Sequence, residues 1–407
     1  GSGDFHPVLR ELSKTRHVLA VDLPGFGRSN EEDKDFGPER LVEAVDRVIR
    51  ACGTPTIDLL GHSSGGALAL LFASTHAQVV RKLVVVDAAG ILLPEVLLRG
   101  QLHQSLSDAR EKVPVASKIA EGLGKLFIQT MHSFVPTATK LSETGLLGDS
   151  PQVLAATRLL DYNFGSAIVT VRADTLVLWG KNDQVAPVRI AHLLDERVHH
   201  SDLLFIDDAA HVPMKDQPDL FASMVSGYLN EGHALLTDAG EPVKPPAPAS
   251  AARAAGPVHL DSRGAPEQAP NTSTRVGRCD KQENIILEGD YAEVEVKECK
   301  RVWLNRVRAR TIRITKSDGR LDRAQVTGGV TMDHAEFSLT GGDLMGETAL
   351  DVRESKLDLA GVQLLGDARA LRVDAKSQLE FSVCPVQSPL TARMLHEQIA
   401  RNEPFEM

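Results

Sequence analysis

Short apolar runs alternate with helical stretches along the first 232 residues of the chain. The runs are near-continuous in hydrophobicity, which is typical of strands buried on both faces of a parallel sheet; they comprise residues 18–21, 57–60, 83–86, 176–179 and 203–206. Between the first two runs, residues 38–52 carry apolar side chains at helical spacing, with Pro38 suited to the first turn and Gly53 to the end. The alternation predicts an α/β domain with a mainly parallel sheet over residues 1–232.

Residues 91–172 interrupt this alternation. The interval is rich in helical patterns, has apolar clusters around Phe127 and Phe134, and is too long for a plain connection. We therefore expect an inserted helical cap. Its apolar character and few charges favour a small hydrophobic substrate, with Phe127 and Phe134 as candidate substrate-binding residues. The alternative is that these residues only pack the cap onto the body of the domain.

A Pro- and Ala-rich stretch at residues 233–276 predicts a linker, after which the hydrophobic period changes. Residues 277–385 contain many short alternating runs. Residues 337–346 align on residues 357–366 at an offset of 20, and this self-similarity is typical of a solenoid. We expect a right-handed β-helix (β-solenoid) of about five coils. A β-sandwich with chance similarity is the alternative.

The last segment, residues 386–407, carries a further helical pattern. Leu390, Met394, Leu395 and Ile399 fall on one face of a helix. We expect a C-terminal capping helix that covers the open end of the solenoid.

Two of the four cysteines, Cys279 and Cys299, lie 20 residues apart, which is one period of the repeat. Stacked coils would place them about 4.8 Å apart, within reach of a disulfide. Cys384 is several coils beyond and cannot pair with Cys299. A bridge would indicate an oxidising, extracytoplasmic compartment, whereas reduced cysteines leave a cytoplasmic location as the default.

Composition limits the classes of protein that the chain can be. Its 407 residues suggest two or three domains. Hydrophobic residues make up 42% and charged residues 25%, which excludes wholesale disorder and a collagen-like fibre. No apolar run is long enough for a transmembrane segment. The net charge of −10 makes nucleic acid an unlikely partner.

One segment of the chain is basic although the net charge is negative. Residues 297–323 hold ten basic and three acidic residues, and Arg306, Arg308 and Arg310 alternate with apolar positions. Such a run is usually a solvated strand face. The sharper hypothesis is a partner with an anionic surface or a polysaccharide, bound at this basic face of the solenoid.

Candidate chemistry lies at the end of the strand at residues 57–60. Gly61 to Gly65 read G-x-S-x-G between that strand and a helical stretch, a context in which the glycines permit a sharp turn that exposes Ser63. A serine nucleophile needs a base and an orienting carboxylate. Asp183 and His211 each follow a later strand, in the order Ser, acid, His. The sequence predicts that these three residues are catalytic.

Other assignments remain open. Asp87, just after the strand at residues 83–86, is an alternative triad acid. His62 is interpreted as a lining, substrate-binding residue of the turn, and the backbone N–H of Ser64 as a donor to the oxyanion hole. The other histidines lack metal-ligand spacing, so we expect no metal and no cofactor.

The N-terminal part of the chain resembles the α/β-hydrolase superfamily, in its capped, esterase-like branch. The matching pieces are residues 22–29, 61–66, 176–183 and 208–214, in the order of that family. The resemblance implies Ser63 as nucleophile, His211 as general base and then acid, and Asp183 as the group that orients the imidazole. The family places strands and a His-Gly turn ahead of this chain's start at Gly1. We therefore expect the chain to be N-terminally truncated, with Ser2 as a candidate for the second oxyanion donor.

Three functional hypotheses follow. The first is a serine hydrolase that cleaves small apolar carboxylic esters through an acyl-enzyme. The second is a C–C bond hydrolase of the same superfamily. The third is a non-catalytic scaffold or adhesion protein that acts through the solenoid.

Overall fold

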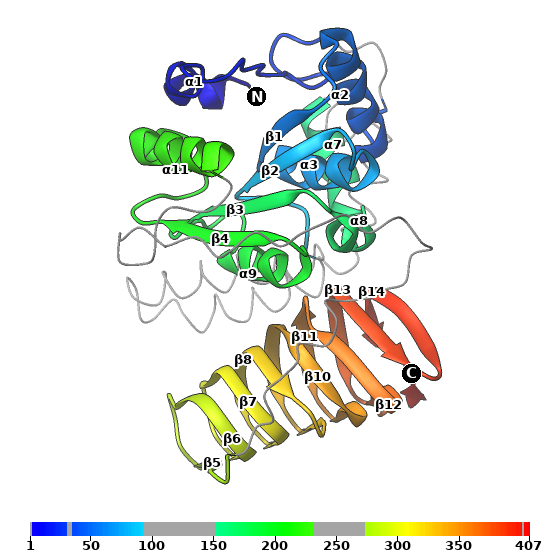
Figure 1. Cartoon of the computed structure of the whole chain (residues 1–407). Helices are drawn as coiled ribbons and strands as arrows, with labels where there is room; N and C mark the ends of the chain where they lie inside the picture. Colours follow the sequence, from blue (N-terminus) through cyan, green and yellow to red (C-terminus); the bar gives the residue numbers. More distant parts are fainter. Residues whose placement is uncertain (1, 31–34, 93–150, 232–272, 401–402) are drawn as a thin grey trace, which may run out of the picture. The chain divides into compact units, whose positions relative to one another are not determined.

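The computed structural model describes residues 2–30, 35–92, 151–231, 273–400 and 403–407. These residues form two compact units, an N-terminal α/β unit and a C-terminal strand-rich unit (Figure 1). Within these ranges, no helix has the length and apolar character needed to cross a membrane. The predicted linker falls almost wholly outside the described residues.

The N-terminal unit is built on a four-stranded parallel sheet in the order β1-β2-β3-β4. Its strands match four of the five predicted runs, which confirms the α/β class; they are β1 (Ile57–His62), β2 (Val80–Val86), β3 (Asp174–Gly180) and β4 (Ser201–Ile206). Strands β2 and β3 are almost fully buried because helices cover both faces of the sheet.

The described helices of this unit divide between the two faces. Helix α3 packs on β1 and β2 and also contacts α2 and α8, whereas α1 and α11 contact each other and share the apolar core on the other face. The helices are η1 (Ser2–Phe5), α1 (His6–Leu12), α2 (Pro38–Cys52), α3 (Ser64–Thr75), α7 (Pro151–Leu160), α8 (Gly165–Thr170), α9 (Val188–Arg197), α10 (Pro213–Asp216) and α11 (Pro218–Glu231). Helix α2 begins at Pro38 and ends before Gly53, whose φ of 66° is the left-handed conformation expected of a glycine cap.

The fifth apolar run is not a strand, so the prediction for residues 18–21 is wrong. The segment pairs with no strand among the described residues. Leu19 is 57% exposed, although Val18 packs partly against the core. An apolar run becomes a strand only where a neighbour accepts its backbone hydrogen bonds.

The predicted cap lies mostly outside the described residues, and so do its candidate substrate-binding residues Phe127 and Phe134. The described remainder of the interval 91–172 carries two helices, α7 and α8, before β3 begins.

The C-terminal unit consists of strands that pair mainly in parallel with the next strands along the chain. They are β5 (Val276–Asp280), β6 (Ile286–Lys297), β7 (Val302–Thr315), β8 (Asp318–Val326), β9 (Val330–Asp333), β10 (Glu336–Arg353), β11 (Lys356–Ala360), β12 (Gln363–Val373), β13 (Gln378–Ser388), β14 (Thr391–Ala400) and β15 (Phe405–Glu406). Phe337 pairs with Leu357, and Gly346 pairs with Gly366. The repeat alignment made from the sequence is therefore the register of the strands.

The C-terminal capping helix is a wrong prediction. The segment forms strand β14, which pairs antiparallel with β13. Leu395 and Ile399 are buried at 1% and 4% exposure, whereas Leu390 is 63% exposed. A spacing of four residues places side chains on one face of a helix and equally on one face of a strand. The free backbone of β13 decides between the two because it supplies hydrogen-bond partners for β14.

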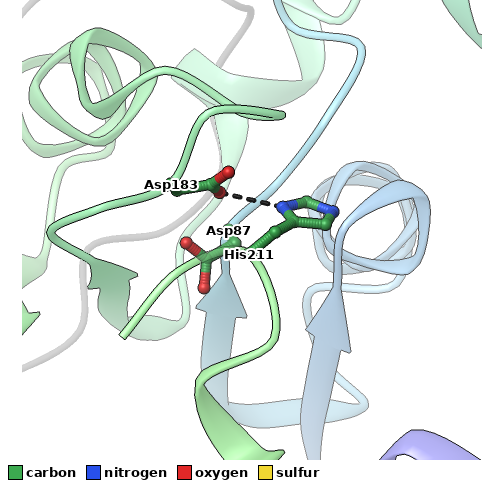
Figure 2. Close-up of side chains that lie close together, drawn as sticks. All are labelled: Asp87, Asp183 and His211. Carbon is green, nitrogen blue, oxygen red and sulfur yellow. Dashed lines mark hydrogen bonds and ion pairs between the residues drawn. The ribbon is translucent and has the colours of Figure 1, made fainter. Parts of the chain in front are cut away.

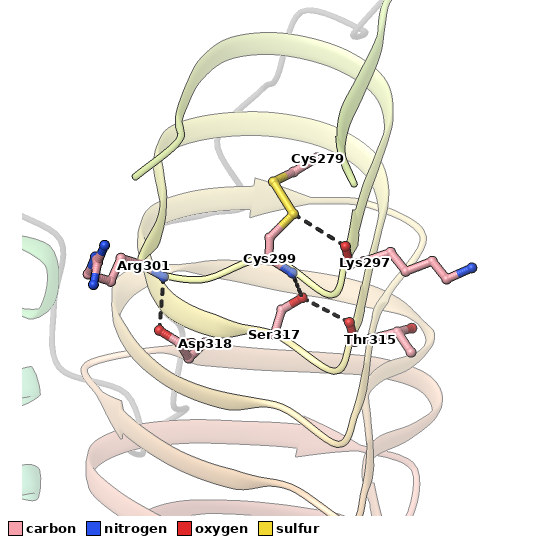
Figure 3. The surroundings of a disulfide bond; sticks show 7 residues. All are labelled: Cys279, Lys297, Cys299, Arg301, Thr315, Ser317 and Asp318. Carbon is pink, nitrogen blue, oxygen red and sulfur yellow. Dashed lines mark hydrogen bonds between the residues drawn. A yellow bond between two sulfur atoms is a disulfide. The ribbon is translucent and has the colours of Figure 1, made fainter. Parts of the chain in front are cut away.

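The predicted proximity of Cys279 and Cys299 is confirmed: the two residues form a disulfide with a Cα–Cα distance of 6.4 Å (Figure 3). The bridge joins the edge strand β5 to the turn that follows β6. Below it, the Ser317 hydroxyl accepts a hydrogen bond from the Cys299 N–H at 2.9 Å and donates one to the Thr315 carbonyl oxygen at 2.8 Å.

Removing this disulfide is expected to destabilise the strand-rich unit. The bond closes a loop of 20 residues, and a loop of that length is worth about 3 kcal/mol of free energy of unfolding. Replacing both cysteines by serine should lower the urea midpoint, measured by circular dichroism. Cys52→Ser is the control, because Cys52 is an exposed free thiol. Equal midpoints for the double variant and the control would contradict the prediction.

The basic segment carries its own counter-charges. Arg308 forms two hydrogen bonds to the Asp290 carboxylate, at 2.6 and 2.7 Å, and Arg310 pairs with Glu293 at 2.7 Å. Arg306, two residues before Arg308, has a left-handed backbone conformation, with φ 48°. An anionic partner for this face stays a prediction, and it would have to compete with these ion pairs.

Candidate active site

Ser63 lies in the tight turn between β1 and α3. Its backbone has φ 55° and ψ −125°, a strained conformation for a residue other than glycine. A Cβ atom on Gly61 would lie 2.1 Å from the Gly65 carbonyl oxygen, so the close turn requires glycine there. The Ser63 N–H donates to the Val86 carbonyl oxygen at 2.9 Å. The neighbouring strand thus holds the serine at the carboxyl end of the sheet.

A chain of hydrogen bonds connects the three residues that were predicted to be catalytic. His211 Nε2 lies 2.9 Å from Ser63 Oγ, and His211 Nδ1 lies 2.8 Å from Asp183 Oδ2 (Figure 2 shows the second contact). The side chains follow β1, β3 and β4, whose carboxyl ends meet at one edge of the sheet. Residues that are up to 148 positions apart in the sequence are therefore within hydrogen-bond distance.

Asp183 is held rigidly behind the imidazole. Its side chain is fully buried, and Oδ1 accepts hydrogen bonds from the N–H groups of Val185 and Ala186 at 2.7 and 3.0 Å. Burial alone would raise the pKa of Asp183, but its hydrogen bonds, first of all the one from His211, outweigh burial and lower the pKa. Asp183 is therefore an ionised carboxylate that faces the imidazole.

Asp87, the alternative acid, lies beside this pair. Its Oδ1 accepts a hydrogen bond from the Gly180 N–H at 3.0 Å, and its side chain is fully buried. Asp183, not Asp87, forms the hydrogen bond to His211 Nδ1. Burial and the neighbouring Asp183 carboxylate raise the pKa of Asp87 to about 9. In the sequence, Asp87 and Asp183 are alternatives for one role, whereas the fold brings both carboxyl groups together beside His211.

Asp87, Asp183 and His211 each have one possible metal-ligand atom, and these three atoms lie within 4.8 Å of one another, a separation that a metal ion could bridge. In this structure His211 Nδ1 and Asp183 Oδ2 already satisfy each other. The arrangement therefore fits proton transfer to and from the imidazole directly.

His62 contacts the backbone of His211. Its ring donates from Nε2 to the His211 carbonyl oxygen at 2.6 Å, and the two ring centroids are 5.0 Å apart. Burial lowers the pKa of His62, which keeps the ring neutral at pH 7. The structure thus gives His62 a contact with His211, and its contact with a substrate stays a prediction.

The two predicted oxyanion donors have different surroundings. Ser64 is the first residue of α3, where backbone N–H groups have no partner within the helix and the helix dipole favours negative charge. The Ser2 N–H instead donates to Asp22 Oδ1 at 2.8 Å. Because that N–H is already engaged by a carboxylate, the assignment of Ser2 to the oxyanion hole is corrected.

Comparison with known proteins identifies the family. A sequence model described as "Alpha/beta hydrolase family" matches residues 1–224, more than half of the chain. The chain belongs to the alpha/beta hydrolase family. The family match covers the parallel sheet and the turn at Ser63, and it leaves the strand-rich unit outside.

The proteins that are similar to this alpha/beta hydrolase include enzymes named for different reactions. A 2-hydroxymuconate semialdehyde hydrolase of Pseudomonas sp. (strain CF600) is 26% identical over 56% of this chain and 81% of its own length. A pimeloyl-[acyl-carrier protein] methyl ester esterase of Salmonella newport (strain SL254) is 29% identical over 53% of this chain and 85% of its own. Among solved structures, an esterase from Exiguobacterium antarcticum has 20% identity and a TM-score of 0.42, covering 56% of this chain and 88% of that chain.

Proposed function

We propose that this alpha/beta hydrolase is a serine hydrolase of small apolar carboxylic esters, with Ser63, His211 and Asp183 as its catalytic triad. The observation that carries the proposal is the unbroken hydrogen-bond chain from Ser63 Oγ through both ring nitrogens of His211 to Asp183 Oδ2. A serine hydroxyl is a weak nucleophile unless a base removes its proton. The ionised, buried carboxylate stabilises the imidazolium that forms when it does so.

The reaction proceeds in two halves. Ser63 Oγ attacks the ester carbonyl carbon while its proton passes to His211 Nε2, and the Ser64 N–H stabilises the oxyanion. The ester C–O bond then breaks, and His211 returns the proton to the departing alcohol. In the second half, His211 takes a proton from water, the resulting hydroxide attacks the acyl-enzyme, and Ser63 recovers its proton as the carboxylic acid leaves.

A second candidate is hydrolysis of a C–C bond in a vinylogous diketone, with the same three residues. The similarity to 2-hydroxymuconate semialdehyde hydrolase favours this candidate, whereas the similarity to a methyl ester esterase favours the first. Turnover of p-nitrophenyl acetate and butyrate, compared with turnover of a vinylogous diketone at equal enzyme concentration, separates them. The larger kcat/KM identifies the reaction class.

We further infer that the strand-rich unit is a β-helix. Supporting this, parallel registers carry one column of residues through successive turns, from Gly277 to Val294, Ile312, Val330, Leu350 and Leu371. Most side chains of this column are buried and apolar, as a stacked solenoid core requires. The right-handed sense of the coil stays a prediction.

Labelling with a fluorophosphonate probe tests the proposed function. Such a probe phosphonylates a serine that an adjacent base activates, so we expect stoichiometric labelling of the full chain at Ser63, located by peptide mass spectrometry. Ser63→Ala should abolish labelling. Ser74→Ala, near the end of the helix α3 that follows Ser63, is the control and should label like the wild type. A folded chain that does not label, as judged by circular dichroism, would support the scaffold hypothesis instead.

A further inference from the structure

We propose that Asp87 is a positioning residue of the active site: its neutral carboxyl group donates a hydrogen bond to the Asp183 carboxylate and holds it behind His211. The inference rests on the proposed function, because it assigns Asp183 as the acid of the triad. In this role Asp87 holds the Asp183 carboxylate in place, whereas Asp183 itself orients the imidazole and His211 moves the proton.

The hydrogen bonds of Asp87 indicate where its proton lies. Oδ1 accepts from the Gly180 N–H at 3.0 Å, but no N–H or O–H donor of the described residues bonds to the buried Oδ2. A buried carboxylate oxygen without a donor is costly, whereas a protonated oxygen needs only an acceptor. The Asp183 carboxylate is the acceptor that we assign to this proton, because an oxygen of each of the two carboxyl groups lies within 4.8 Å of the other.

The backbone also directs Asp87 toward this position. Asp87 follows the buried strand β2 and has a φ of 42°, a left-handed conformation that is unusual for a residue with a side chain. Its N–H donates to the Leu178 carbonyl oxygen of β3 at 3.3 Å. The strand ends thus hold the carboxyl group between β2 and β3, next to the loop that carries Asp183.

The charges around Asp87 are consistent with a neutral form. Of the titratable groups on the surrounding elements, Asp183 follows β3, His211 follows β4, Asp216 lies in α10 and His62 ends β1. Asp183 and Asp216 both disfavour a second negative charge. Two carboxylates at this spacing do not both ionise readily, so one of them keeps a proton.

A pH profile distinguishes this role from simple packing. Because burial and the Asp183 carboxylate raise the pKa of Asp87 to about 9, wild-type kcat for ester hydrolysis should decline above about pH 9. Two carboxylates then repel each other behind His211. Asp87→Asn keeps a donor that cannot ionise, so its loss at pH 7 should be at most about tenfold and its alkaline decline should vanish. Asp87→Leu lacks the donor and should lose about 10- to 100-fold in kcat.

Two comparisons complete the test. Asp183→Asn should lose about 10⁴-fold in kcat, far more than Asp87→Asn; equal losses would overturn the proposal by making Asp87 the working acid.

The second comparison measures stability and needs no activity. Folded Asp87 keeps a proton that the unfolded chain releases above about pH 4, so wild-type stability should fall relative to Asp87→Asn as pH rises from 5 to 9.

The stability comparison keeps the two proposals separate. If the wild type neither labels nor hydrolyses esters, the proposed function fails, while the urea midpoints of wild type and Asp87→Asn still show whether Asp87 is neutral. Midpoints that stay parallel from pH 5 to 9 would overturn the neutral carboxyl group, whatever the activity.

Discussion

Replacing His211 by alanine is expected to lower kcat for ester hydrolysis by a factor of about 10⁴ to 10⁶. His211 is the single group that contacts both Ser63 Oγ and the Asp183 carboxylate, at 2.9 and 2.8 Å, among the described residues. Without it, the serine keeps its proton and the carboxylate has no imidazolium to stabilise. Initial rates with p-nitrophenyl butyrate at pH 8 measure the effect.

The matched control for this variant is His17→Ala, because His17 is an exposed histidine of the same unit. We expect the control to keep wild-type kcat, and both variants to keep the wild-type circular dichroism spectrum. A His211→Ala variant that is folded and within tenfold of the wild type would exclude His211 as the general base.

Replacing Trp179 by alanine is expected to lower the free energy of unfolding of the α/β unit by about 3 to 5 kcal/mol. The indole is fully buried in β3, and its Nε1–H donates to the Ala186 carbonyl oxygen at 3.0 Å. Alanine leaves a large cavity and an unpaired buried acceptor. Urea unfolding followed by circular dichroism measures the loss.

Trp179→Ala should also loosen the position of Asp183, because Ala186, which accepts the indole hydrogen bond, donates its N–H to the Asp183 carboxylate. Trp179→Phe fills most of the space but lacks the indole N–H, so it isolates the hydrogen bond, whose loss we expect to cost about 1 to 2 kcal/mol. Trp303→Phe, in the strand-rich unit, is the control for the α/β unit. Equal stability of Trp179→Ala and wild type would contradict the packing argument.

The proximity of Ser63, Asp183 and His211 could be predicted from the sequence because the signals are local. The G-x-S-x-G turn at Ser63 needs particular residues within five positions, and Asp183 and His211 each follow directly on a buried strand. Parallel strands bring such ends to one edge, so spacing along the chain was enough to anticipate contact. The offset of 20 residues that links Cys279 to Cys299 predicted their proximity in the same way.

Predictions failed where a pattern allowed two structures. The spacing of Leu395 and Ile399 fits a helix and a strand equally, and the backbone of β13 selected the strand. The run at residues 18–21 has the composition of a strand but lacks a paired neighbour among the described residues. The role of Ser2 depended on the position of one carboxylate, Asp22, twenty residues away.

By itself, the sequence determined the α/β class, the period of the strand-rich unit and the three residues of the proposed active site. Those features depend on side-chain periodicity and on backbone turns, which are encoded over a few neighbouring positions. Only the tertiary structure decided which carboxyl group contacts His211 and that Asp87 lies buried beside Asp183. Burial and the distances between groups from different strands set the protonation of such a pair, and neither is visible in the order of residues.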